Sequence, residues 1–85
     1  MILKVYTTQI CPKCRRLKNF LFDKGIEFEV MDMEDANTMT ELFSHGVYTF
    51  NAPVLQIENA FLLTETMFNG VDLREDFIMK TIKEA

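Results

Sequence analysis

Two cysteines, Cys11 and Cys14, stand three positions apart with Pro12 and Lys13 between them, and the chain has no others. A disulfide that closes so short a loop restricts the unfolded chain very little, so it would be a weak structural crosslink. No secretion signal is visible at the N-terminus, and in a reducing compartment such a pair is more often chemical than structural. The spacing therefore predicts a dithiol site that exchanges with disulfides. The expected location of the protein is the cytoplasm.

The residues around the pair indicate that Cys11 is the nucleophile. The thiolate, not the thiol, attacks a disulfide, so this cysteine must be held where negative charge is favoured. Pro12 suits the first position of a helix, which places Cys11 at the helix start, beside unpaired backbone N–H groups and the positive end of the helix dipole. Lys13 adds positive charge nearby. Thiols in such sites have pKa values of about 3.5 to 7.5, against ~8.5 for a free thiol.

Cys14 is suited to the second step of the exchange. It begins an apolar stripe with Leu17 and Leu21 at helical spacing, so we expect it to be more buried than Cys11. A buried second thiol can attack the mixed disulfide on the first and release the reduced substrate. We therefore predict that Cys14 is the resolving cysteine.

Metal binding is a rival use for the same cysteines. A structural zinc site normally takes four protein ligands, whereas this chain offers two cysteines and the distant His45. A lone histidine before a glycine more often ends a helix, where positive charge is welcome. We predict no metal ion and no cofactor within one chain. A metal ion or an iron–sulfur cluster shared between two chains, in an adaptor domain, stays open as an alternative.

The apolar pattern predicts seven elements in the order β-α-β-α-β-β-α. Thr38 with Glu41, and Asp72 with Glu75, resemble capping boxes that begin the second and third helices. A strand, a helix and a strand favour a right-handed crossover with parallel pairing, and the later hairpin adds antiparallel strands. This predicts an α/β fold, a minimal thioredoxin-like one with a mixed four-stranded sheet and three helices. The expected strands are 2–6, 27–31, 54–57 and 61–63, and the expected helices are 12–24, 38–45 and 72–82.

Composition limits the possible partners. The 85 residues, 48% of them hydrophobic, suit a single domain spanning 1–85. A net charge of −4 argues against nucleic-acid binding, and no apolar run approaches the ~18 residues of a membrane span. We expect a monomer with a protein partner and no membrane or nucleic-acid partner.

Pro53 stands at the first residue of a predicted strand, where its missing N–H is tolerated. Only about 5–6% of X–Pro bonds are cis, so a trans bond is the ordinary expectation. The order of elements, however, places the preceding loop beside the thiols. If the Ala52–Pro53 bond is cis, the backbone of Ala52 could pair with an extended substrate strand.

Together these segments resemble the glutaredoxins and their close relatives. Val5-Tyr6-Thr7-Thr8 runs into Cys11-Pro12-Lys13-Cys14, and Ala52-Pro53-Val54 precedes a hairpin. The resemblance implies a thioredoxin fold, a nucleophilic Cys11, a resolving Cys14 and a cis Pro53. The chemistry it implies is the reversible reduction of protein disulfides or of glutathione mixed disulfides.

Two departures from the family pattern argue against glutathione. Thr8 stands where glutathione-using members usually carry a lysine that holds the tripeptide carboxylate. Residues 64–72 hold a single glycine where these members usually have a Gly-Gly followed by an acidic residue. Asp72 could still hold the glutathione amine, so a glutathione-dependent glutaredoxin remains the first alternative.

A second branch of the family fits the same region. Phe68-Asn69-Gly70-Val71 resembles the aromatic-polar-Gly-apolar motif of the NrdH-type redoxins, with Phe in place of the usual Trp. This resemblance implies a thioredoxin-like electron carrier that is regenerated by a thioredoxin-reductase-type enzyme and serves ribonucleotide reductase. We therefore predict a dithiol–disulfide oxidoreductase acting on protein disulfides. The predicted partner-contacting residues are Ile10, Phe50, Phe68, Asn69 and Gly70.

Overall fold

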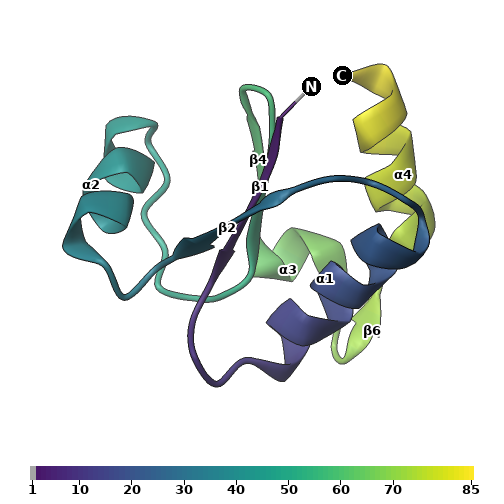
Figure 1. Ribbon diagram of the computed structural model, residues 1–85, viewed down its shortest axis with the longest axis horizontal. Coiled ribbons are helices and arrows are strands. Elements are labelled where there is room, and N and C mark those ends of the chain that lie inside the picture. Colours follow the sequence, from purple (N-terminus) through teal and green to yellow (C-terminus); the bar gives the residue numbers. More distant parts are fainter. Residues whose placement is uncertain (1) are drawn as a thin grey trace.

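The computed structural model describes residues 2–85, which form a central sheet with helices on both faces (Figure 1). The sheet has four strands in the order β2-β1-β3-β4. β1 pairs in parallel with β2 and antiparallel with β3, and β3 pairs antiparallel with β4. The mixed sheet predicted from the sequence is therefore confirmed. Its strands are β1 (Leu3–Thr7), β2 (Glu29–Asp32), β3 (Val54–Ile57) and β4 (Ala60–Leu62).

Three helices cover one face of the sheet and a fourth covers the other. Figure 1 shows α1, α3 and α4 on the side opposite to α2. No helix within residues 2–85 is both long and apolar enough to cross a membrane. The helices are α1 (Pro12–Asp23), α2 (Ala36–Ser44), α3 (Thr64–Met67) and α4 (Glu75–Glu84).

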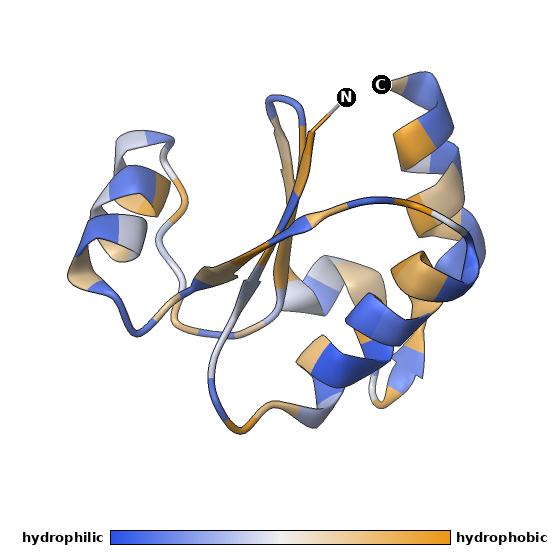
Figure 2. Cartoon of the chain, in the orientation of Figure 1, coloured by the Kyte–Doolittle hydropathy of each residue, from blue (hydrophilic) through white to orange (hydrophobic). Residues whose placement is uncertain are grey.

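Successive side chains along each strand point to opposite faces of the sheet, and this produces two hydrophobic cores, one on each face. Leu3 and Val5 of β1 pack with α1 and α4, whereas Tyr6 points to the opposite face and packs with Leu42 of α2. Figure 2 shows the result, with hydrophobic strands between helices that mix hydrophobic and hydrophilic residues. An ion pair between Arg16 and Glu75 joins α1 to α4 at the surface.

Helix α1, at the start of which the cysteines lie, begins where the sequence predicts and ends at Asp23, one residue before the predicted end. Pro12 is its first residue and Cys11 is its N-cap. The helix is followed by Gly25, whose positive φ of 69° lets the chain turn back. The Ile26 N–H then donates to the Leu21 carbonyl at 3.0 Å, and this bond closes the helix end.

Both capping-box predictions are wrong. Helix α2 begins at Ala36, because the carboxylate of Asp35 accepts a hydrogen bond from the Asn37 N–H at 2.7 Å. Asp caps a helix better than Thr does, and Thr38 is buried inside the helix instead. Helix α4 begins at Glu75 after Arg74, which makes no side-chain cap bond.

The segment between β4 and α4 holds structure that the sequence pattern does not reveal. The one-turn helix α3 is followed by β5 (Phe68–Asn69) and β6 (Asp72–Leu73), which form a separate two-stranded ladder. Gly70, with a φ of 63°, lies in the turn between them. The Arg74 N–H donates to the Met67 carbonyl at 2.8 Å and closes the ladder against α3. Residues 2–85 thus contain four helices where we predicted three.

Tyr6→Phe is expected to lower the free energy of unfolding by about 0.5–1.5 kcal/mol at neutral pH, because the Tyr6 hydroxyl donates to Gln56 Oε1 at 2.6 Å. Burial, followed by the charges of Glu41 and Glu29, raises the pKa of Tyr6 above its usual value of 10.0. An unfolded tyrosine ionises at lower pH than this folded one. The stabilisation is therefore complete below about pH 10 and is lost as pH rises through the folded pKa.

Denaturant titrations of the wild type and of Tyr6→Phe between pH 7 and pH 11 measure this effect. We expect the two stabilities to converge at the alkaline end. A constant difference across the whole range would contradict the assignment to Tyr6.

Candidate active site

The two cysteines lie at the start of α1 in different environments and are joined by a disulfide. Their Cα atoms are 5.2 Å apart, so neither backbone segment has to move for the sulfurs to meet. Cys11 is partly exposed, whereas Cys14 is only 2% exposed and faces the core. The first sulfur is therefore accessible to a large partner and the second is covered by the protein.

The helix start is arranged to favour negative charge on Cys11. The backbone N–H of Cys14 donates to Cys11 Sγ at 3.0 Å, so the sulfur itself caps the helix. Such a bond and the helix dipole both stabilise a thiolate at this position. First-turn acidic residues, which would oppose that charge, do not occur in α1.

Few potential metal ligands lie near these cysteines. Within residues 2–85, no group of three or more His, Cys, Asp or Glu side chains is placed to hold a metal ion. His45 follows α2 and packs its ring against Phe61, with ring centroids 5.3 Å apart. The histidine therefore does not join the cysteines.

A proline loop lies opposite the cysteines. The Ala52–Pro53 peptide bond is cis, as the resemblance to the glutaredoxins implies. The Thr64 hydroxyl donates to the Pro53 carbonyl at 2.7 Å, and this buried bond joins the loop to α3. Since Tyr6 pairs with Val54, the end of β1 and the start of β3 are adjacent. The turns carrying Cys11 and Pro53 therefore meet at one end of the sheet.

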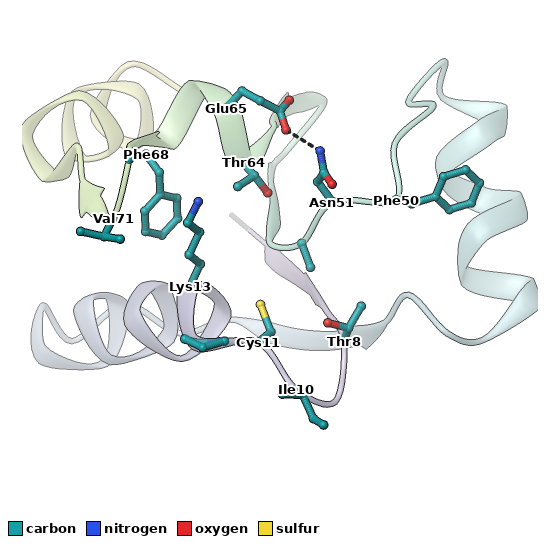
Figure 3. A pocket seen from close by; sticks show the side chains of 13 residues that line it. Thr8, Ile10, Cys11, Lys13, Phe50, Asn51, Thr64, Glu65, Phe68 and Val71 are labelled. Carbon is teal, nitrogen blue, oxygen red and sulfur yellow. Dashed lines mark hydrogen bonds between the residues drawn. The ribbon is translucent and has the colours of Figure 1, made fainter.

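A groove of about 870 Å³ lies between these two turns, with Cys11 at its centre (Figure 3). Of the residues predicted for the site, eight line it, while Cys14 and Pro53 are buried beneath its surface. Asn69 does not line the groove and pairs instead with Asp72 in the small ladder. The lining residues are Thr8, Ile10, Cys11, Pro12, Lys13, Phe50, Asn51, Ala52, Thr64, Glu65, Phe68, Gly70 and Val71.

Five lining residues were not predicted for the site from the sequence: Thr8, Asn51, Thr64, Glu65 and Val71. The Asn51 amide donates to Glu65 Oε1 at 3.0 Å and links the proline loop to α3 (Figure 3). Thr64 and Glu65 belong to the one-turn helix, which is too short to show a periodic pattern. The neighbouring Pro53 was the one available signal for Asn51.

Phe68 belongs to the core and to the groove at once. It is 6% exposed and packs in the core beneath α1 and α4, yet one side of it lines the groove. The ammonium group of Lys13 lies 5.5 Å from the centre of its ring, an attractive cation–π geometry. This contact directs Lys13 across the groove beside Cys11 (Figure 3).

The glutaredoxin family model matches residues 3–59, which include both cysteines, the cis proline and the first three strands. The chain belongs to the glutaredoxin family. No curated protein matches it significantly.

Solved structures show that the thioredoxin-like fold extends beyond the matched segment of this glutaredoxin-family chain. The thioredoxin-like protein BC3987 is 21% identical, with a TM-score of 0.68, over 92% of this chain and 96% of that one. The NrdH-redoxin of Escherichia coli is 19% identical over 94% and 93% of the two chains, with a TM-score of 0.68. Glutaredoxin 1 of Francisella tularensis is 17% identical over 73% and 80%, with a TM-score of 0.57. At these identities the likeness concerns the fold.

The difference in exposure predicts selective alkylation. When the reduced glutaredoxin-family chain is treated with less than one equivalent of iodoacetamide, Cys11 should carry the label and Cys14 should not, because Cys14 is 2% exposed. Peptide mapping by mass spectrometry gives the ratio of label on Cys11 to label on Cys14. As a control, the chain is labelled while unfolded in denaturant, where the two cysteines should react equally. Preferential labelling of Cys14 in the folded chain would contradict this assignment.

Proposed function

We propose that this chain is a dithiol–disulfide oxidoreductase that reduces disulfides in other proteins. The observation that carries the proposal is the asymmetry of the pair, with Cys11 capping α1 in an open groove and Cys14 buried directly behind it. A nucleophile needs access and a stabilised thiolate, whereas a resolving thiol needs only to reach the first sulfur. Membership of the glutaredoxin family supports the same chemistry.

The reaction takes place in two exchanges. The Cys11 thiolate attacks one sulfur of the substrate disulfide, the substrate S–S bond breaks, and its other sulfur leaves as a thiolate. The Cys14 thiolate then attacks Cys11 Sγ, forms the Cys11–Cys14 disulfide and releases the second substrate thiol. Two electrons pass from the dithiol to the substrate. The Cys14 N–H and the start of α1 stabilise the Cys11 thiolate before the attack and when it leaves.

The proline loop supports docking of the substrate. Ala52 lines the groove opposite Cys11, next to the cis bond, and we propose that its backbone pairs with an extended substrate strand. Ile10, on the turn before Cys11, and Phe50, on the loop before Ala52, also line the groove and are 92% and 81% exposed. Side chains so exposed are available to a partner. Phe68 and Gly70 form the opposite side of the groove.

A thioredoxin-reductase-type enzyme is the electron source we propose, in the cytoplasm, with ribonucleotide reductase as one candidate substrate. The Phe68-Asn69-Gly70-Val71 motif and the fold shared with the Escherichia coli NrdH-redoxin, which is described as having a thioredoxin-like activity profile, support this choice. Lys13 is the one cation among the groove residues named above, and Glu65 lies opposite it. A tripeptide with two carboxylates finds few partners there, which makes glutathione the weaker candidate.

The reductant that restores the dithiol tests the proposal. The oxidised chain is offered excess glutathione with glutathione reductase, or a thioredoxin-reductase-type enzyme with NADPH, and free thiols are counted over time. We expect rapid recovery with the reductase and slow recovery with glutathione. Efficient recovery with glutathione alone would instead identify a glutathione-dependent glutaredoxin, and recovery with neither would overturn the proposed electron source.

A further inference from the structure

Three aromatic side chains form an exposed cluster next to the groove. Phe43 belongs to α2, and Tyr48 and Phe50 belong to the loop that leads to β3. The rings of Phe43 and Tyr48 are stacked with centroids 5.4 Å apart, and Phe50 meets Phe43 edge-on at 6.4 Å. The three are 36%, 76% and 81% exposed. We call Phe43, Tyr48 and Phe50 the aromatic shelf.

The shelf is held in place although its rings are exposed. Val47 is buried in the core beneath α2 at one end of the loop, and Pro53 is buried at the other. Between them the Asn51 N–H donates to Thr49 Oγ1 at 3.1 Å, and the Asn51 amide donates to Glu65. The loop therefore presents Tyr48 and Phe50 to solvent in an ordered arrangement. Clustered exposed rings of this kind mark interaction surfaces.

The shelf is continuous with the groove through Phe50, which belongs to both. Figure 3 shows Phe50 pointing away from Cys11 toward the α2 side, whereas Lys13 and Phe68 lie on the other side of Cys11. The shelf residues carry no charge, and the only groove cation named above, Lys13, lies beside Cys11 on the side opposite to Phe50. A segment attached to Cys11 thus meets apolar rings in one direction and an ammonium group in the other.

We propose that the shelf selects disulfide substrates in which an aromatic side chain lies on one side of the attacked cysteine and an acidic side chain lies on the other. The aromatic ring packs on Tyr48 and Phe50, and the carboxylate pairs with Lys13. This selectivity rests on the proposed function only in that Cys11 forms the mixed disulfide. The occupant is an extended segment of a partner protein, paired along the Ala52 loop.

Peptide disulfides test the selectivity. The substrate is the disulfide of a short peptide in which the cysteine has a tryptophan two residues away on one side and an aspartate two residues away on the other. The peptide is made in both orders, and a matched peptide has serine in place of the tryptophan. We expect the reduced chain to react about tenfold faster with the tryptophan peptide in its better order. In the Tyr48→Ser/Phe50→Ser double variant, the rate with the tryptophan peptide divided by the rate with the serine peptide should fall to about one. Phe22→Ser is the matched control, because Phe22 is 78% exposed and lies outside the groove and the shelf.

Fluorescence separates docking from chemistry, since the chain contains no tryptophan. A peptide with serine in place of its cysteine cannot exchange, so its tryptophan emission reports noncovalent docking alone. We expect emission to move to shorter wavelength with the wild type and with Phe22→Ser, and to stay unchanged with the double variant. This readout stands even if Cys11 forms no mixed disulfide, an outcome that would refute the proposed function instead.

Two results would overturn the shelf proposal. One is an equal rate ratio and an equal emission shift in the wild type and the double variant. The other is a dimer that dissociates when Tyr48 and Phe50 are replaced, measured by analytical ultracentrifugation, which would make a second copy of this chain the occupant.

Discussion

Cys11→Ser abolishes the reduction of protein disulfides, a loss we expect to be on the order of a thousandfold or more, because no second group can supply the first attack. Cys11 is the partly exposed sulfur at the start of α1, whereas Cys14 is 2% exposed behind it. A protein-disulfide substrate followed by thiol counting measures the loss. Circular dichroism of the reduced variant serves as the control for folding.

Cys14→Ser separates the two steps of the same reaction. Cys11 still attacks, but the mixed disulfide persists because the buried thiol that would resolve it is gone. We expect a covalent complex between the variant and its substrate on non-reducing gels, with Cys11 identified as the linked residue by mass spectrometry. Full turnover of protein disulfides by this variant would show that Cys14 has no resolving role.

Leu17→Ala gives the second large effect, on stability. Leu17 is fully buried one turn after Cys14, in the core between α1 and the sheet. Truncating a buried leucine costs about 2–5 kcal/mol, because it removes apolar contacts and leaves a cavity. A domain of this size has about 5–15 kcal/mol in total, so the variant should approach unfolding. Urea denaturation of the reduced chain at pH 7 gives the difference in free energy.

Phe22→Ala is the matched control for Leu17→Ala, since Phe22 lies on the same helix but is 78% exposed. We expect its stability to differ from that of the wild type by less than about 0.5 kcal/mol. Equal losses in the two variants would mean that α1 is not anchored through its buried face. The activity of Leu17→Ala at low temperature, where the chain is folded, then reports whether the thiols keep their positions.

The sequence contains enough pattern to predict the sheet and the helix that carries the cysteines. Pro12 at the first helical position, the apolar spacing from Cys14 to Leu21, and Gly25 beyond the end all concern neighbouring residues. The hairpin likewise depends on local alternation in β3 and β4. Such local rules hold here because the core packing agrees with them.

The errors occur where short-range signals compete or where elements are too short for periodicity. Asp35, which the sequence pattern assigns to a loop, is the N-cap of α2 ahead of Thr38, since a carboxylate caps a helix better than a threonine hydroxyl does. The one-turn α3 and the two-residue strands around Gly70 depend on contacts with the rest of the fold, such as the bond from the Thr64 hydroxyl to Pro53. One side of the groove belongs to this segment, so Thr64, Glu65 and Val71 were not predicted, whereas Phe68 and Gly70 were predicted from their resemblance to a family motif.

The pairing of Tyr6 with Val54 has a consequence for how the chain acquires its reactivity. A shift of one residue between β1 and β3 would slide the cysteine turn past the proline turn by about 3.3 Å and turn the side chains of a whole strand to the opposite face. A sheet closed in any other alignment therefore leaves the two turns without a common groove. During folding, we expect the substrate groove to form in one step, when β1 and β3 pair in this register, and not gradually as the helices form.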